Sequence, residues 1–356
     1  MSGMLLRLAG TAAVAAQAVL APVSAAAAPD PQPSVARLLT DLQRLYRQTE
    51  QATETYNATT EKLERQRAEV ARLDAELVRA RLTLGAHRTD AGRLARQQYQ
   101  SGDGLGPYVR LLFAPDPQHA LDEGHVIGEL ARERARTVAL LTEAEKRKDA
   151  LARAARKALD TQLGLAGRQR RQRDEVRDRL AGVERLLAHL TPEQLAAVAR
   201  LEEQGVAAAQ RRLATAGALP DDRPAGPRAR RAVGYAMAQL GKPYRWGAQG
   251  PDAYECSGLT SQAWSHAGTP IPRTSQEQWR RLPKVPLNRL RPGDLVVYFP
   301  EATHVALYVG DGKVVQAPRP GEKVTVAPLA SYPVLGAVRP GPGGGDSGQA
   351  PVSEPR

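Results

Sequence analysis

The sequence has little of what several globular cores would need. Its 356 residues include only 2 Phe and 3 Trp, and aromatic residues make up 4% of the chain. A chain of this length is too long for one ordinary domain, yet it has too few large apolar side chains to fill several compact cores. We therefore expect much of the chain to be elongated. The compact part should follow residue 240, where all three tryptophans lie (Trp246, Trp264, Trp279).

Long apolar runs without charges are lacking after the N-terminal segment, so we expect no transmembrane segment in the mature protein. The N-terminus has the pattern of an export signal: Arg7 is followed by an apolar stretch of small residues and by small-residue cleavage positions at 24–28. We expect residues 1–28 to be a signal peptide, cleaved near Ala26. An uncleaved anchor is the alternative, which Gln17 and Pro22 disfavour.

The chain has one cysteine, Cys256. Cysteines of exported proteins usually pair in structural disulfides, so a single one indicates an intermolecular bridge or a reactive thiol. One cysteine, with no His-x-x-x-His pair, also lacks the ligand pattern of a zinc site. We therefore expect no metal and no other cofactor.

The charge of the chain is strongly one-sided. A formal net charge of +12 and a pI near 10.1 fit an anionic partner. The interleaved aromatic residues and basic blocks of a nucleic-acid reader are missing, so we expect no nucleic-acid binding. For an exported protein, an anionic polymer of the envelope is the simpler partner.

The first two hundred residues have the periodicity of long helices. Apolar residues recur at seven-residue steps from Tyr56, and a second run does so from Leu130, after a stretch at 101–119 rich in Gly and Pro. The first helix would be on the order of 100 Å long. We expect an antiparallel coiled-coil hairpin over residues 29–216. Its seams would be Tyr56, Leu63, Val70, Leu77 and Leu84, with Leu73 and Ala80 between them, facing Leu130, Thr137, Ala144, Leu151, Ala158 and Leu165.

The hairpin is either a solvated spacer or a regulatory element. The second option rests on the apolar residues at its tip, Leu111, Leu112 and Phe113, whose exposure would be costly without a partner. A third helix should begin at Thr191, which can cap it. Residues 217–227 have the composition of a linker, and residues 341–356 that of a disordered tail.

Residues 228–340 have the pattern of a compact α+β domain. Two short helices are expected at 230–240 and from Cys256 to Trp264, followed by strands at 294–299, 304–309, 313–317, 324–328 and 334–338. Cys256 would lie in the first turn of its helix, where unpaired N–H groups and the helix dipole lower the pKa of a thiol. These N–H groups could also stabilise an oxyanion. A buried, inert cysteine is the alternative.

Only one of the six histidines suits the role of base for this thiol. Four lie in the helical region (His87, His119, His125, His189). His266 follows Cys256 by ten positions on the same expected helix, about 15 Å along the axis. His304 remains, at the start of an apolar strand, and we expect it to pair with Cys256.

Four segments of this domain together resemble the NlpC family of papain-like cell-wall cysteine peptidases. They are PYRWG (243–247), ECSGL (255–259), RPGDL (291–295) and HVALYVG (304–310). The resemblance covers about residues 228–340. It implies hydrolysis of the γ-D-glutamyl to diaminopimelate bond in peptidoglycan stem peptides, by a secreted, wall-associated enzyme. The Cys attacks the peptide carbonyl, and the His takes the thiol proton and returns it to the leaving amine.

The resemblance also implies roles for four further residues. Gln316 falls where a polar residue orients the imidazole, although the family commonly has His there. Glu255 stands where the family commonly has Asp, and Tyr244 and Ser257 should lie near the thiol and the substrate amine. Hairpins of this type in some relatives restrain the active site or contact a division complex, which implies such roles here. A core aromatic and a helix-start hydroxyl are the alternatives for Tyr244 and Ser257.

Two other functions compete with this hypothesis. The chain could be a non-catalytic envelope scaffold that works through its helices, although an intact Cys256 and His304 argue against it. It could also be an amidase that applies the same thiol chemistry to the bond between sugar and peptide.

Overall fold

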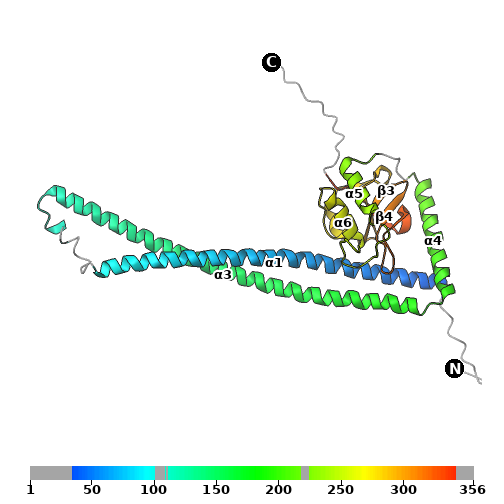
Figure 1. Cartoon of the computed structure of the whole chain (residues 1–356), viewed down its shortest axis with the longest axis horizontal. Coiled ribbons are helices and arrows are strands. Elements are labelled where there is room, and N and C mark those ends of the chain that lie inside the picture. The colour runs from blue at the N-terminus through cyan, green and yellow to red at the C-terminus, as the bar shows by residue number, and fades with distance from the viewer. Residues whose placement is uncertain (1–33, 101–108, 110, 218–223, 342–356) are drawn as a thin grey trace, which may run out of the picture.

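The computed structural model describes residues 34–100, 109, 111–217 and 224–341. The expected signal peptide, the end of the tail and part of the expected linker lie outside these residues. Two helices dominate the molecule, α1 (Val35–Gln100) and α3 (Pro117–Ala188), and they run antiparallel as a long hairpin (Figure 1). The predicted antiparallel helical hairpin is thus confirmed. No helix among the described residues is long and apolar enough to span a membrane.

The hairpin is held by small and aliphatic side chains at the predicted spacing. Leu73 and Leu77 of α1 pack with Ala155 and Ala158 of α3, and Leu63 and Leu84 are also buried. The alanines allow close approach of the two helices along a narrow seam. Near the turn the side chains open to solvent, and Leu112 and Phe113 are 81% and 80% exposed.

Helix α4 (Pro192–Thr215) follows a sharp turn at the base of the hairpin. Thr191 caps it as expected, because its hydroxyl accepts from Gln194 N while the Gln194 side chain accepts from Thr191 N. The helix returns along one side of the C-terminal domain (Figure 1). There Gln210 donates to Gly312 O and accepts from Ala330 N, so α4 is fastened to the domain.

The C-terminal part has the expected α+β class. Its helices are α5 (Pro227–Met237), α6 (Cys256–His266) and α7 (Ser275–Arg281). Its strands are β1 (Lys284–Val285), β2 (Leu295–Tyr298), β3 (His304–Gly310), β4 (Lys313–Gln316), β5 (Thr325–Pro328) and β6 (Val334–Val338), with short 3₁₀ turns η1 (Leu287–Arg289) and η2 (Leu329–Ser331). The strands form one antiparallel sheet in the order β1-β6-β2-β3-β4-β5.

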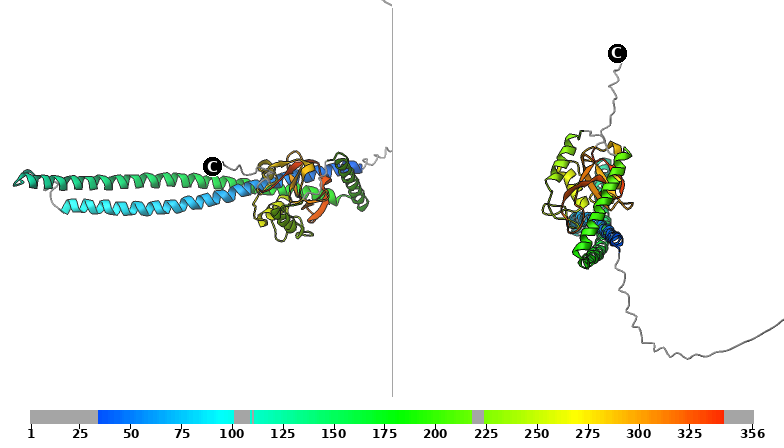
Figure 2. Two further views of the ribbon diagram at one scale, coloured as in Figure 1. Left: turned by 90° about the horizontal axis from the view of Figure 1, so that it is seen from above. Right: turned by 90° about the vertical axis from the view of Figure 1, so that its right-hand side faces the viewer.

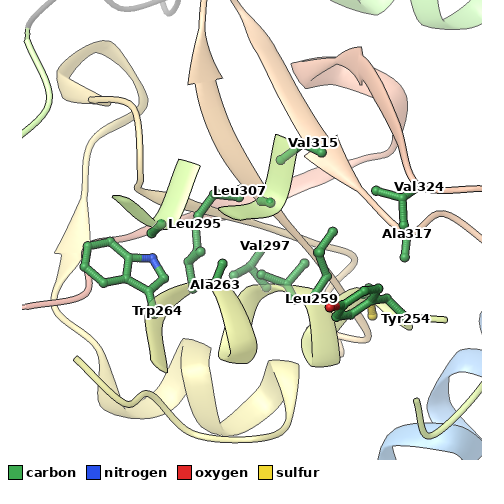
Figure 3. Close-up of a cluster of buried hydrophobic side chains, with 14 of the residues drawn as sticks. Tyr254, Leu259, Ala263, Trp264, Leu295, Val297, Leu307, Val315, Ala317 and Val324 are labelled. Carbon is green, nitrogen blue, oxygen red and sulfur yellow. The ribbon is translucent and has the colours of Figure 1, made fainter. Parts of the chain in front are cut away.

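The sheet is buried on both faces. On one face, Leu259 and Trp264 of α6 pack on Val297 and Leu307, in a cluster that also includes residues of α5 (Figure 3). On the other face Ala306 and Tyr308 pack with Leu329, and Leu213 of α4 lies against this second cluster. Strand β3 therefore has no solvated face, and its first side chain, His304, is fully buried.

The hairpin and the domain meet along one stretch of α1. Figure 2 shows the domain lying over the end of the hairpin where α1 begins. Within residues 49–60, α1 has no Leu, Ile or Val, and six polar residues there are buried (Thr49, Glu50, Thr53, Glu54, Asn57, Thr59). This polar stretch enters the candidate site.

Candidate active site

Cys256 is the first residue of α6 and is almost fully buried. Glu255 precedes it in an extended conformation (φ −104°, ψ 175°) and does not cap the helix through its side chain. The first-turn N–H groups of a helix have no intrahelical partner. The thiol therefore lies at a helix start, as the sequence predicted.

His304 begins β3, and Gln316 ends the neighbouring strand β4. Pairing of β3 with β4 brings the two side chains together, and His304 Nε2 lies 2.8 Å from Gln316 Oε1. Because a neutral amide oxygen only accepts, the imidazole donates from Nε2. The other ring nitrogen, Nδ1, is then left as the atom that can take a proton.

Two aromatic rings also contact the imidazole of His304. The ring of Tyr332 lies edge-on at 4.9 Å between centroids, with an interplanar angle of 70°. The ring of Tyr298, the cross-strand partner of His304, lies at 5.7 Å. The imidazole is thus fixed by one hydrogen bond and two ring contacts.

A second group of polar contacts surrounds the residues on either side of Cys256. Glu255 Oε2 accepts from Gly247 N at 2.5 Å, and its Oε1 pairs with the guanidinium of Arg273 at 2.6 Å. Arg273 also donates to Ser257 Oγ at 3.0 Å and to Gly247 O at 3.2 Å. One buried arginine therefore ties the residues on either side of Cys256 to the loop at Gly247.

Tyr244 belongs to the same buried cluster as Cys256. Burial raises the pKa of its hydroxyl well above the usual value, and the charges of Glu255 and Cys256 add to this. The phenol is thus near both residues, as the resemblance implies, and is held in its neutral form.

Helix α1 places three polar side chains in this site. Glu50 Oε1 lies 3.2 Å from His304 Nδ1, and Glu54 Oε1 lies 3.9 Å from Cys256 Sγ. Asn57 Nδ2 donates to Glu255 Oε1 at 2.6 Å. With spacings of four and three residues, these side chains share one face of the helix.

The carboxyl of Glu54 is held by several donors. Ser257 Oγ donates to Oε1 at 2.7 Å, and Ser275 N donates to Oε2 at 3.2 Å. Burial and the charge of Glu255 nevertheless raise the pKa of Glu54 to about 8, although Ser257, Arg273 and Ser275 oppose the shift. In the resemblance Ser257 faces a substrate amine, whereas here its hydroxyl faces a carboxyl.

The expectation of a lowered thiol pKa is wrong for this conformation. Burial raises the pKa of Cys256 well above its usual value, and Glu54, Glu255 and Glu50 raise it further. A hydrogen bond from the backbone of Val305 opposes the shift but does not outweigh it. The physical reason is α1, which excludes water from the thiol and adds two carboxyl groups to its surroundings.

The other histidines lie where the sequence placed them. His266 is the last residue of α6, and its ring packs against Tyr235 at 4.8 Å. His87, His119, His125 and His189 lie on or next to the hairpin helices. His304 remains the candidate base.

Sequence reasoning missed the contributions of Arg273, Ser275 and α1. Arg273 and Ser275 stand in the short stretch before and at the start of α7, a helix that was not expected. The sequence of α1 does indicate that this stretch makes an unusual contact. Residues 49–60 lack Leu, Ile and Val, which is unusual for a helix whose buried face meets a domain core.

A family model described as the NlpC/P60 family matches residues 241–335. This part of the chain is an NlpC/P60 domain. It includes Cys256, His304 and Gln316 and thus the whole of the candidate site on the C-terminal domain. Helices α1, α3 and α4 lie outside the matched residues.

Curated relatives of the NlpC/P60 domain are named endopeptidases. A probable endopeptidase of Corynebacterium glutamicum is 43% identical over 107 residues, which cover 30% of this chain and 51% of the relative. The murein DD-endopeptidase MepH of Escherichia coli is 39% identical over 102 residues, covering 26% and 38%. This chain therefore spans about half the length, or less, of these relatives.

Parts of this chain are also similar to solved structures. An NlpC/P60 family protein from Bacillus cereus is 31% identical, with a TM-score of 0.30 over 31% of this chain and 39% of that chain. The NlpC/P60 domain of the peptidoglycan hydrolase SagA is 29% identical, with a TM-score of 0.29 over 31% and 97%.

Proposed function

We propose that this protein is a thiol endopeptidase of peptidoglycan stem peptides, with Cys256 as nucleophile, His304 as base and Gln316 as the residue that orients the imidazole. The observation that carries the proposal is the contact of His304 Nε2 with Gln316 Oε1, since it makes Nδ1 the ring nitrogen that can act as a base on a buried thiol at a helix start.

The reaction has two steps. Nδ1 of His304 takes the thiol proton, Sγ attacks the peptide carbonyl, and the imidazolium returns the proton to the leaving amine as the C–N bond breaks. Water then attacks the thioester, giving its proton to His304, and the acid product leaves as the thiol forms again. The N–H groups at the start of α6 stabilise the oxyanion of both tetrahedral intermediates.

The proposed bond is that between γ-D-glutamate and diaminopimelate. Glu255, held by Arg273 and Gly247, offers Oε1 as an acceptor for a substrate N–H where Asn57 now donates. Tyr244 and Ser257 flank the same position. The name of the E. coli relative supports a second candidate, a D,D-bond of murein.

We further propose that α1 restrains the enzyme. Glu50 engages the nitrogen that must accept the thiol proton, and Glu54 fills the space beside the sulfur. Asn57 occupies the acceptor on Glu255. Substrate can reach the thiol only if this stretch of α1 moves away.

The remaining proposals concern the localisation of the protein and its partners. The expected signal peptide and the wall substrate point to a secreted, wall-associated enzyme that acts in remodelling or cell separation. The exposed Leu112 and Phe113 at the far end of the hairpin suit contact with an envelope or division complex that would pull on α1.

Mass spectrometry of purified wall fragments digested by the protein tests the proposed reaction. Products that end in γ-D-glutamate, with a free amino group on diaminopimelate, support the proposed bond. Products cut at a D,D-bond favour the second candidate, and release of intact stem peptides from sugar indicates an amidase. If no product depends on Cys256, the non-catalytic scaffold is the hypothesis that remains.

A further inference from the structure

A cavity of about 270 Å³ lies beside His304, between α1 and the C-terminal domain. Its domain wall includes Phe299, Tyr332 and Arg319, and its α1 wall includes Tyr46 and Glu50. Nothing in the proposed mechanism uses this cavity so far. Two of its wall residues nevertheless contact the candidate base, since Tyr332 packs on the His304 ring and Glu50 reaches Nδ1.

The position of the cavity indicates which half of a substrate it would take. The imidazolium must give its proton to the leaving amine, so the leaving half lies on the His304 side of the thiol. The groups proposed for the acyl half are Glu255 and Arg273, and Asn57 of α1 donates to Glu255. Along α1, residues 46–50 therefore cover the leaving side and residues 54–57 the acyl side.

The domain wall of the cavity combines an apolar surface with a cation. The rings of Phe299 and Tyr332 lie 5.5 Å apart and can pack on methylene groups. Arg319 supplies a guanidinium whose side chain is 18% exposed. A side chain with an aliphatic body and an acidic end matches both features.

The helical region already supplies such an acid to Arg319. Glu202 of α4 binds the guanidinium in a bidentate manner, with both N···O distances at 2.9 Å, and Tyr46 of α1 stacks on it at 4.8 Å. Glu322 of the domain pairs with Nε at 2.6 Å. Because the fork of an arginine is matched to a carboxylate, Glu202 occupies the place where an acidic ligand would bind.

We propose that this cavity is the leaving-group subsite, and that Arg319 recognises a carboxylate at the end of the leaving residue's side chain. Phe299 and Tyr332 pack on the methylene groups, and the ligand replaces Glu202 on the guanidinium. Diaminopimelate has this chemistry, whereas lysine has the same chain without the carboxylate. The inference rests on the proposed function, which places diaminopimelate on the leaving side.

The test compares two synthetic peptides that differ only in diaminopimelate or lysine after the scissile bond. The full chain is used with Glu50→Ala and Glu54→Ala, which remove the α1 contacts with His304 and the thiol. We expect a kcat/KM about tenfold higher for the diaminopimelate peptide, as for one charge-assisted contact. Arg319→Gln, and also Arg319→Lys, should bring the ratio of the two values close to one.

Glu202→Gln tests the subsite independently, in the same chain with Glu50→Ala and Glu54→Ala. It removes the competing carboxylate, so KM for the diaminopimelate peptide should fall relative to that for the lysine peptide. Glu203→Gln, an exposed neighbour, is the matched control and should leave the ratio unchanged.

Each outcome decides between the hypotheses. Equal kcat/KM for the two peptides in the parent chain would overturn the subsite and leave the proposed function standing. Equal losses for both peptides with Arg319→Gln would show that Arg319 only supports the fold. Failure to cut either peptide would instead reject the proposed bond, and the subsite with it.

Discussion

Glu50 Oε1 and His304 Nδ1 face each other at 3.2 Å, and both side chains are buried. Because Nε2 already donates to Gln316, Nδ1 is the ring atom that faces the carboxyl group of Glu50. The ring nitrogen proposed as the base is thus engaged by a residue more than 250 positions away in the chain. This contact joins the hairpin directly to the side chain that is proposed as the base.

The roles of thiol and base can be tested with three single variants. Cys256→Ala and His304→Ala should each lower turnover of wall peptides by about 10³-fold or more, because neither group has a substitute in the site. His266→Ala should retain nearly full activity, because His266 lies at the far end of α6 from Cys256, where its ring contacts Tyr235 of α5. Release of soluble fragments, followed by chromatography, measures all three. Wild-type turnover in Cys256→Ala would reject the thiol mechanism.

The restraint by α1 can be tested without shortening the chain. Glu50→Ala with Glu54→Ala should raise the rate on soluble wall peptides by about tenfold or more, because the contacts of α1 with His304 and Cys256 are both lost. Glu64→Ala is the matched control, since Glu64 is exposed on α1 and pairs only with Arg67. The alkylation rate of Cys256 by iodoacetamide should rise in parallel. If both rates stay at wild-type values, α1 does not limit access to the thiol.

The restraint should weaken as pH rises. The pKa of Glu54 is about 8 when α1 is docked, because of burial and then of Glu255, against an ordinary value of 4.5. Below pH 4.5 the carboxyl is protonated in both states, and docking carries no penalty from this group. Between pH 4.5 and 8 the free carboxyl has lost a proton that the docked one keeps, so docking weakens by at most about tenfold per pH unit. Above pH 8 this penalty is constant.

A comparison with Glu54→Gln isolates this effect, because the two proteins differ only in this carboxyl group. The ratio of wild-type to variant activity should rise from pH 5 to pH 8 and then level off. A ratio that is flat with pH would mean that Glu54 does not change its protonation on docking.

Two variants of Gln316 test whether this residue orients the His304 imidazole or is only part of the strand. Gln316→Ala should lower kcat by about 10 to 100-fold with a smaller change in KM, as for other residues that orient a reacting side chain. Gln316→Glu should favour the charged imidazole, so the acidic limb of the pH–rate profile, where His304 must lose its proton to act as a base, should move to higher pH. Full activity in the first variant, with an unmoved profile in the second, would make Gln316 a simple strand residue.

Much of the local structure followed from the sequence by itself. The seven-residue spacing of small and aliphatic residues determined the hairpin, because such a seam can be buried only against a second helix. Thr191 and Gln194 determined the start of α4 through reciprocal capping bonds. Elimination among one cysteine and six histidines predicted that Cys256 pairs with His304, and this pairing stays a prediction. Each of these inferences depends on short-range patterns or on residue counts.

Tertiary structure alone decided how the hairpin meets the domain. The polar stretch at 49–60 has no local preference that reveals its partner, and Glu54 and Cys256 are about two hundred residues apart. The raised pKa of the Cys256 thiol follows from that contact, since the same helix start would favour thiolate if water reached it. Local sequence thus determined where the Cys256 thiol lies, and packing against α1 determined the direction in which its pKa shifts, because burial and nearby carboxyl groups outweigh the field of one helix terminus.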